Sequence, residues 1–222
     1  MTLEQDVANT SVDVTDLYVA VGSVLGPLGD IHGKDIEDPA QPASSWFRQG
    51  GRFLRMGAGA YAVLEALTWA QPLSFIENMH LGDEQRSAPA VLQDLLDGKL
   101  VVRLPKTDDV DAWQSIFDLT VISHGIGLGQ DARETQWFDV ATRALPWQSP
   151  GGQPEPGSIV RLGWLNYLFW GSCDGRRTIR DVVASLEDIG SYSESSPAES
   201  VPALLRTLLQ TPIASLDRFG ED

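Results

Sequence analysis

Three kinds of feature are scarce in this chain, and each shortage excludes a class of protein. Cys173 is the only cysteine, which excludes an intrachain disulfide bond and a structural zinc site built from several cysteines. No apolar run approaches the ~20 residues needed to span a bilayer. The start of the sequence, Met1–Asp6, lacks the basic residues and apolar core of a secretion signal. These absences predict a cytoplasmic protein with no membrane segment.

Basic residues are also few. The 222 residues include 16 Lys and Arg against 31 Asp and Glu, a formal net charge of −15. Residues 1–110 hold 8 basic and 16 acidic side chains and residues 111–222 hold 8 and 15, so the two parts carry −8 and −7. A field of this sign repels polyphosphate and anionic lipid. Nucleic acid is therefore disfavoured as a partner.

Three blocks of sequence recur in the same order in the two parts of the chain, at offsets of 100, 106 and 113 residues. They pair Leu17–Ser23 with Phe117–Ser123, Gly51–Gly57 with Gly157–Gly163, and Pro89–Leu96 with Pro202–Leu209. An offset that grows in small steps is expected when loops lengthen between retained elements of a repeat. The pattern predicts two tandem repeats, residues 17–110 and 111–222, after a flexible N-terminal stretch of residues 1–16.

Each repeat is predicted to contain two strands followed by three helices, which gives an α+β fold. In the first repeat these elements are expected at Leu17–Leu25, Arg52–Met56, Ala58–Trp69, Leu73–Met79 and Val91–Leu96. In the second they are expected at Ile116–Ser123, Ser158–Leu162, Trp164–Cys173, Ile179–Ser185 and Leu204–Leu209. The leucine pairs of the last helix recur at i, i+1, i+4 and i+5, a spacing that marks one apolar helix face.

The first repeat closes with a pattern typical of a helix end and a hairpin. Gly98 is expected to take the left-handed conformation after the third helix. The apolar stretch Lys99–Leu104 then predicts a strand, Pro105–Asp109 the tip of a hairpin, and Trp113–Ile122 its return strand.

This close resembles the third helix and wing of the winged-helix superfamily. The segment that carries the resemblance is Tyr61–Leu104, which ends in Leu95-Leu96-Asp97-Gly98-Lys99-Leu100-Val101-Val102. It is also similar to the small winged-helix domains of the PqqD type, which recognise peptides. The resemblance implies two winged-helix-like units, each of three helices with a small sheet. In the second repeat Thr211-Pro212 replaces Asp97-Gly98, so a complete second wing is not predicted.

No set of residues predicts catalysis, a metal site or a cofactor. The glycines of Gly125–Gly129 lack the spacing of a dinucleotide-binding loop, so they indicate a turn or bulge. The histidines, His32, His80 and His124, share no ligand spacing. We therefore expect that the chain is not an enzyme.

Two groups of side chains are candidates for binding a partner. The first comprises large apolar residues near the connection between the two predicted strands of a repeat or near its first helix. The second is the one basic cluster in the sequence. They are Trp46, Phe47 and Trp164, and Arg176, Arg177 and Arg180. A place in the core is the alternative for the aromatic residues, and a solvated helix end is the alternative for the arginines.

The function that these patterns favour is a non-catalytic intracellular interaction or regulatory protein that binds a peptide or protein partner. A winged-helix DNA-binding transcriptional regulator is the alternative. Its recognition helices would expose Gln93, Asp94 and Asp97 in one repeat and Arg206 and Thr207 in the other, a poor match to DNA phosphates. The sequence leaves open whether the chain forms homo-oligomers.

Overall fold

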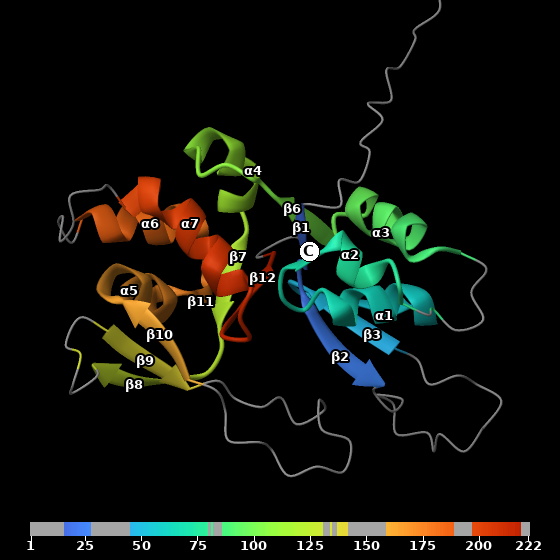
Figure 1. The fold of residues 1–222 in the computed structure, drawn as a ribbon, viewed down its shortest axis with the longest axis horizontal. Coiled ribbons are helices and arrows are strands. Elements are labelled where there is room, and N and C mark those ends of the chain that lie inside the picture. The colour runs from blue at the N-terminus through green and yellow to red at the C-terminus, as the bar shows by residue number, and fades with distance from the viewer. Residues whose placement is uncertain are drawn as a thin grey trace, which may run out of the picture.

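A computed structural model describes residues 16–27, 45–79, 81, 86–130, 134, 137–141, 159–188 and 197–218. Within these residues the fold is α+β, with helices packed against four small three-stranded antiparallel sheets (Figure 1). None of the helices in this part of the chain is both long and apolar enough to cross a membrane. Apart from Asp16, the predicted flexible N-terminal stretch lies outside the described residues, as do His32 and His80.

Within the described residues, the first half of the molecule contains six strands and three helices. In chain order they are β1 (Leu17–Ala20), β2 (Ser23–Pro27), β3 (Ser45–Gln49), β4 (Arg52–Met56), α1 (Ala58–Ala66), β5 (Gln71–Pro72), α2 (Leu73–Ile76), α3 (Ala88–Asp97) and β6 (Val101–Leu104). The predicted strand over residues 52–56 and the start of the first helix at Ala58 are confirmed. The predicted strand over residues 17–25 is interrupted at Gly22, whose φ of +140° turns the chain from one sheet into another.

The second half repeats this order after a short helical connection. The connection contains a 3₁₀ helix (Val110–Trp113) and α4 (Gln114–Phe117). The repeated elements are β7 (Thr120–Ser123), β8 (Ile126–Gln130), β9 (Trp137–Ala141), β10 (Ile159–Gly163), α5 (Trp164–Ser172), β11 (Asp174–Thr178), α6 (Ile179–Asp188), α7 (Pro197–Leu209) and β12 (Ala214–Asp217).

Strand pairing is the same in the two halves. The sheet order β5-β1-β6 corresponds to β11-β7-β12, and β2-β3-β4 corresponds to β8-β9-β10. A bulge interrupts β2 between Val24 and Gly26, and another interrupts β8 between Gly127 and Gly129. These places are equivalent, so the glycine-rich run over residues 125–129 forms the predicted bulge. In Figure 1 the two bulged sheets lie along the lower side of the molecule, with α1 above one and α5 above the other.

Backbone hydrogen bonds outside the sheets are repeated as well. The amide of Ala20 donates to the carbonyl of Leu67 at 2.9 Å, and the amide of Ser123 donates to that of Cys173 at 3.1 Å. These pairs place β1 and β7 at an offset of 103 residues. The sequence match at an offset of 100 was therefore shifted by three residues, because Phe117 belongs to α4 and the strand begins only at Thr120.

The predicted wing hairpin after the third helix is wrong. β6 pairs with β1 instead, from Leu17 opposite Leu104 to Ala20 opposite Val101. β1 therefore lies beside β6 in the place that the return strand of a wing would occupy. Trp113, at the end of the 3₁₀ helix, is fully buried in the core of the second half, and its indole N–H donates to the carbonyl of Thr107 at 2.8 Å. The connection therefore packs as helix rather than strand.

The end of α3 also differs from the prediction by one residue. Gly98 keeps a helical φ of −75°, and Lys99 takes the left-handed conformation with φ of +56°. The amide of Leu100 donates to the carbonyl of Leu95, and that of Lys99 to the carbonyl of Leu96, each at 2.9 Å. This pair of bonds is a Schellman motif in which Gly98 is the C-cap and Lys99 the following residue.

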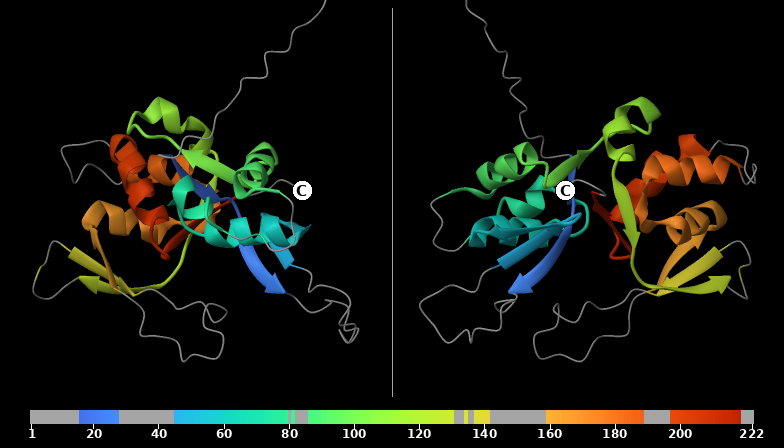
Figure 2. Two further views of the ribbon diagram at one scale, coloured as in Figure 1. Left: turned by 45° about the vertical axis from the view of Figure 1, so that its right-hand side comes forward. Right: turned by 180° about the vertical axis from the view of Figure 1, so that it is seen from behind.

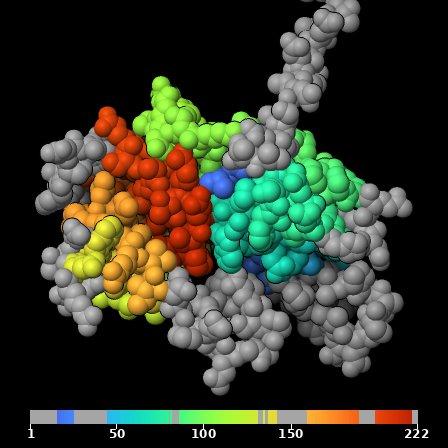
Figure 3. Space-filling view, viewed as in Figure 1, coloured from blue at the N-terminus to red at the C-terminus, as the bar shows by residue number. Residues whose placement is uncertain are grey.

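The two halves share strand β1 between their cores. Tyr18 and Ala20 pack into the core of the first half, whereas Val19 and Val21 pack into the core of the second. Alternate residues of a strand point to opposite faces, so each core takes one face of β1. Between the halves, the amide of Ala70 also donates to the carbonyl of Leu209 at 2.5 Å. The red atoms of the second half lie directly against the teal atoms of the first in Figure 3, and both views of Figure 2 show the halves joined around β1 and β12.

Candidate partner-binding surface

Most of the exposed large apolar side chains gather on one small sheet. The described part of the chain has seven such residues, and five belong to β8, β9, β10 or the first position of α5. Each of the five is at least 37 % exposed; they are Ile126, Leu128, Trp137, Ile159 and Trp164. An apolar group of this kind is a recurrent feature of surfaces that contact other molecules.

The strand register places Ile126, Trp137 and Ile159 on one face, and the exposed Leu128 lies beside them at the bulge of β8, without a register partner. Ala141 lies opposite both Ile126 and Ile159 in the antiparallel sheet. Directly opposed residues of antiparallel strands share a face, so the three form a row across β8-β9-β10. Trp137 follows on the same face of β9. We call this surface, made of Ile126, Leu128, Trp137, Ala141 and Ile159, the apolar face.

The other side of the sheet is filled by aromatic side chains, so the apolar face is not needed for the core. Phe138 lies 4.8 Å from Tyr167 and 5.2 Å from Trp164 between ring centroids, and Tyr167 lies 5.7 Å from Trp170. A Cβ added to Gly127 would meet the Tyr167 hydroxyl oxygen at 2.5 Å. Gly127 therefore faces α5, and Ile126, which precedes it on β8, faces away from the helix.

Strand β8 also has a free edge within the described part of the chain. The sheet order is β10-β9-β8, and the sequence of β8 is Ile-Gly-Leu-Gly-Gln, with no charge and no proline. Proteins commonly protect exposed edges with lysine, proline or a covering segment. An uncharged edge beside an apolar face is suited to accept an added strand from another chain.

The aromatic residues predicted to bind a partner fall in different environments. Phe47 is fully buried in the core of the first half, which removes it from any surface. Trp46 is partly exposed on the opposite face of β3. Trp164 is 43 % exposed at the start of α5, where its ring packs on Phe138 on the helix side of the sheet. None of the three therefore belongs to the apolar face.

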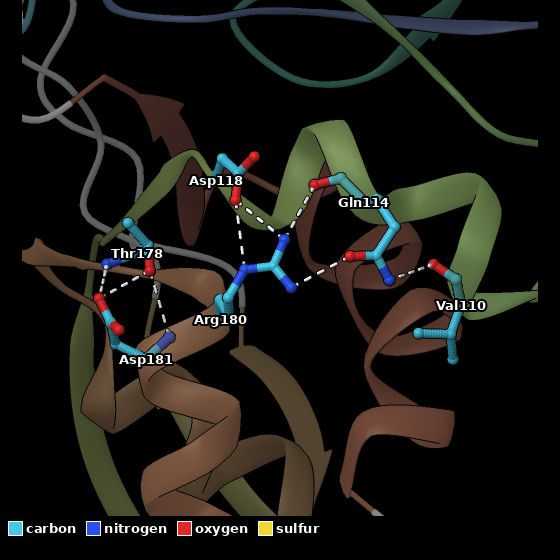
Figure 4. A network of polar contacts seen from close by, with 6 residues as sticks. All are labelled: Val110, Gln114, Asp118, Thr178, Arg180 and Asp181. Carbon is cyan, nitrogen blue, oxygen red and sulfur yellow. Dashed lines mark hydrogen bonds and ion pairs between the residues drawn. The ribbon is translucent and has the colours of Figure 1, made fainter.

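The predicted basic cluster is largely occupied by contacts within the chain. Arg180 holds α6 against α4, as Figure 4 shows: its Nη2 lies 2.9 Å from Asp118 Oδ1, and its Nη1 donates to Gln114 Oε1 at 3.0 Å. At the same helix end, the Thr178 hydroxyl donates to the Asp181 carboxylate at 2.7 Å. This bond lowers the pKa of Asp181 below its ordinary value. Arg180 therefore has a structural role in positioning α6.

The other two arginines of the cluster differ in how they are held. Arg177 donates to the carbonyl of Ser172 at 2.7 Å and lies 3.6 Å from Asp174. The amide of Arg176 bonds to Asp174, which lowers the pKa of that carboxyl group. The Arg176 side chain is exposed, and none of the described residues pairs with it. The three arginines do not form one continuous binding surface.

One serine and one histidine lie in contact, as the nucleophile and base of some catalytic sites do. His124 Nε2 lies 2.7 Å from Ser215 Oγ, and burial lowers the pKa of His124, so the imidazole is neutral at pH 7. However, Ser215 is only 6 % exposed. The nearby Asp217 is bonded to Arg48 and to the amide of Gly50 rather than to the histidine. This contact is a buried polar pair within the sheet, without the oriented base of a catalytic triad.

Neither comparison with known proteins nor the other described residues identify an activity. No family model matches the chain, and no curated protein or solved structure matches it either. The described residues include no group of three or more His, Cys, Asp or Glu side chains placed to hold a metal ion. Function is therefore argued from the surfaces themselves.

Sequence reasoning overlooked the apolar face because an apolar residue in a strand is ordinarily assigned to the core. The stretch Ile126–Gln130 alternates glycines with larger side chains, but the bulge places the two glycines on opposite faces. Gly127 faces the aromatic side chains of α5, whereas Gly129 lies opposite Asp139 on the outward face. The alternation in the sequence therefore does not identify the outward residues.

Proposed function

We propose that this protein is a non-catalytic binding protein whose second half holds an extended, apolar segment of a protein partner. The segment adds as a strand beside β8, and its apolar side chains cover the apolar face. The observation that carries this proposal is the concentration of exposed apolar side chains on β8-β9-β10. We also propose that each half is a winged-helix-like unit in which β1 or β7 takes the place of the wing's return strand. The helix–strand–helix–helix–strand order of each half supports this description.

The apolar face supplies part of the free energy of binding. Fully burying one large apolar side chain contributes about 1.5–3 kcal/mol. Ile126, Leu128, Trp137 and Ile159 are 37–57 % exposed, so each can contribute only about half of this, and together they offset part of the ~4–15 kcal/mol that association costs in lost freedom. Backbone hydrogen bonds along β8 add orientation. The ion pair between Arg161 and Asp139, at 3.5 Å, places a polar pair in the middle of the face.

The alternative of a DNA-binding regulator has less support. In the first half Asp94 and Asp97 are exposed on α3. In the second, Arg206 on α7 lies 2.8 Å from Asp108 and 5.6 Å above the ring of Trp113. The helices that a winged helix would insert into DNA thus present carboxylates or an arginine already engaged, which disfavours phosphate contact.

A displayed library of random extended peptides tests the proposal. Peptides selected on the intact protein are expected to be apolar at alternate positions. Leu128→Asp and Ile159→Asp are each expected to weaken their binding at least about ten-fold, because a carboxylate is placed on a surface that is buried in the complex. Phe75→Asp is the matched control, because Phe75 is as exposed as Leu128, at 56 %, but lies on α2 of the other half.

Three results would argue against the proposal. The first is a library that yields no binders. The second is a set of binders that tolerate both aspartate variants, or that lose affinity equally with Phe75→Asp. The third comes from sedimentation: a dimer that Ile159→Asp converts to monomer would make the apolar face a contact between two copies of this chain.

A further inference from the structure

The first half carries a surface of opposite character on its equivalent sheet. Residues 45–64, which span β3, β4 and most of α1, contain no acidic side chain but three arginines. This is unusual in a chain in which acidic residues outnumber basic residues 31 to 16. The arginines are Arg48, Arg52 and Arg55. The sequence did not reveal them as a basic group, because they are spread over a hairpin rather than along one helix.

Strand pairing brings arginines and aromatic rings together on one face. Arg55 lies directly opposite Trp46, and Arg48 lies directly opposite Phe53. Phe47 and Leu54 point the other way, into the core of the first half. Phe53 is 53 % exposed. We call this outward surface, made of Trp46, Arg48, Phe53 and Arg55, the arginine–aromatic face. Arg52 lies opposite the buried Gln49, on the other face of the hairpin.

The hairpin that carries this face is held rigidly against the second half. Arg48 pairs with the buried Asp217 at 3.1 Å, and the same carboxylate accepts the amide of Gly50 at 2.7 Å. Gly50 has a φ of +56°, and a Cβ there would meet the carbonyl oxygen of Arg218 at 2.5 Å. The Gln49 amide group donates to the carbonyls of Val21 and Lys99. These contacts preorganise the face and leave it exposed.

Arg52 and Arg55 differ from most arginines of the chain because no carboxylate among the described residues pairs with them. Six arginines elsewhere in the described residues form ion pairs with carboxylates: Arg86, Arg103, Arg161, Arg177, Arg180 and Arg206. Arg161 is the structural counterpart of Arg55. It is opposed by Asp139, where Arg55 is opposed by Trp46. Among the described residues, the Arg55 guanidinium thus has no carboxylate partner and lies beside aromatic rings, at the position where the second half has the Arg161–Asp139 pair.

We infer that the arginine–aromatic face binds a short, extended, acidic segment of a partner protein. A carboxylate of the segment pairs with Arg55 in the bidentate geometry that guanidinium favours. Apolar groups of the segment pack on Phe53 and Trp46. This surface is separate from the apolar face, so the inference does not depend on the proposed function.

Charge favours an acidic protein segment over a nucleic acid. A nucleic acid carries a phosphate at every nucleotide, so its whole length is exposed to the repulsion of a chain with a net charge of −15. Arg55, the arginine of this face without a carboxylate partner among the described residues, supplies few compensating contacts. A protein segment needs only one or two carboxylates at the face, and its remaining residues can be neutral.

The test uses the intact protein and a fluorescently labelled eight-residue peptide, Glu-Ser-Leu-Ser-Glu-Ser-Leu-Ser, whose glutamates and leucines share one face when it is extended. Fluorescence anisotropy at low and at physiological salt should show binding that weakens as salt rises. The same peptide with glutamine in place of glutamate should bind at least about ten-fold more weakly. Arg55→Gln should weaken the glutamate peptide by at least about ten-fold, since it removes a charge-assisted contact. Arg55→Lys should recover only part of this loss, because lysine cannot form the bidentate pair.

Arg161→Gln is the matched control. It removes an arginine at the equivalent position of the other half, where Asp139 and Glu134 already compensate the charge, and it should change the affinity less than two-fold. Phe53→Ser provides an arm that leaves charge unchanged and should weaken binding several-fold. The inference is overturned if the glutamate peptide does not bind, if the glutamine peptide binds equally well, or if Arg161→Gln matches Arg55→Gln. Tighter binding of an oligothymidylate than of the glutamate peptide would also overturn it, in favour of single-stranded nucleic acid.

Discussion

The two halves of this molecule have the same strand order, the same bulge and the same backbone hydrogen bonds, yet their outward sheet faces have opposite chemistry. Arg55 and Arg161 occupy equivalent positions on β4 and β10. Trp46 lies opposite the first and Asp139 opposite the second. At the next pair along the strands, Arg48 and Phe53 in the first half correspond to Ala141 and Ile159 in the second. One face is cationic and aromatic, and the other is largely apolar.

This difference separates what the fold requires from what it leaves free. Inward positions such as Phe47 and Val140 are fully buried in both halves, because each sheet must pack against its first helix. Outward positions make no such contact, so substitution there costs little stability. Two surfaces of different specificity can therefore be built on one repeated scaffold, without any change in its strand pairing.

The largest effect is expected from truncating the equivalent leucines of the third helices. Leu95 and Leu208 are both buried, one in each core. Leu95→Ala and Leu208→Ala should each lower the unfolding free energy by about 2–5 kcal/mol, because each leaves a cavity. Since β1 contributes to both cores, calorimetry should show one transition, displaced to lower temperature in either variant. Phe75→Ala, at an exposed site, is the control. Two separable transitions, only one of them shifted, would show that the halves unfold independently.

A smaller effect distinguishes the halves by pH. His124 stands in the second half where the first has Val21: their amides donate to the carbonyls of Ile213 and Leu100 at 2.7 and 2.8 Å. Burial lowers the pKa of His124 below its ordinary value, which is about 6.5. Protonation of His124 therefore favours the unfolded chain. The stability that the neutral imidazole contributes above about pH 6.5 is lost as the pH falls through the folded-state pKa of His124. Urea unfolding between pH 7.5 and 5.5 should show this loss.

The variant for this experiment is His124→Val, which installs the residue of the first half. It removes the 2.7 Å contact with Ser215, so its stability should be lower at every pH. The informative quantity is the slope: the variant should lose less stability than the parent as the pH decreases across this range. Equal slopes would assign the pH dependence to other groups.

These comparisons also show why part of the molecule could be predicted from its sequence and part could not. Local signals, such as the helix-forming and aromatic residues of 58–69 and 164–173 and the leucine pairs of α3 and α7, placed most helices correctly. The wing was wrong because β6 pairs with a strand more than 80 residues earlier in the chain. Local periodicity carries no information about such a partner.

The candidate surface was harder to predict for a related reason. The side chains of Phe47 and Trp46 are adjacent in sequence but point to opposite faces of β3, and only the position of α1 decides which face is buried. For the same reason the exposed residues of β8 and β10 looked like core residues. A strand pattern predicts that two faces exist, whereas the packing of the helix decides which of them meets solvent.

The smallest effect is expected at the single cysteine, which is the counterpart of Leu67 in the first half. The carbonyls of both residues accept equivalent bonds from Ala20 and Ser123, and both side chains are buried. Burial raises the pKa of the Cys173 thiol to about 12, so very little thiolate exists at pH 8. A disulfide reagent should therefore leave the folded protein unmodified and react fully only after denaturation. If the position serves only packing, Cys173→Val should change the unfolding free energy by less than about 1.5 kcal/mol. Rapid modification of the native protein would show that this site, unlike Leu67, opens to solvent and that the equivalence of the two halves ends there.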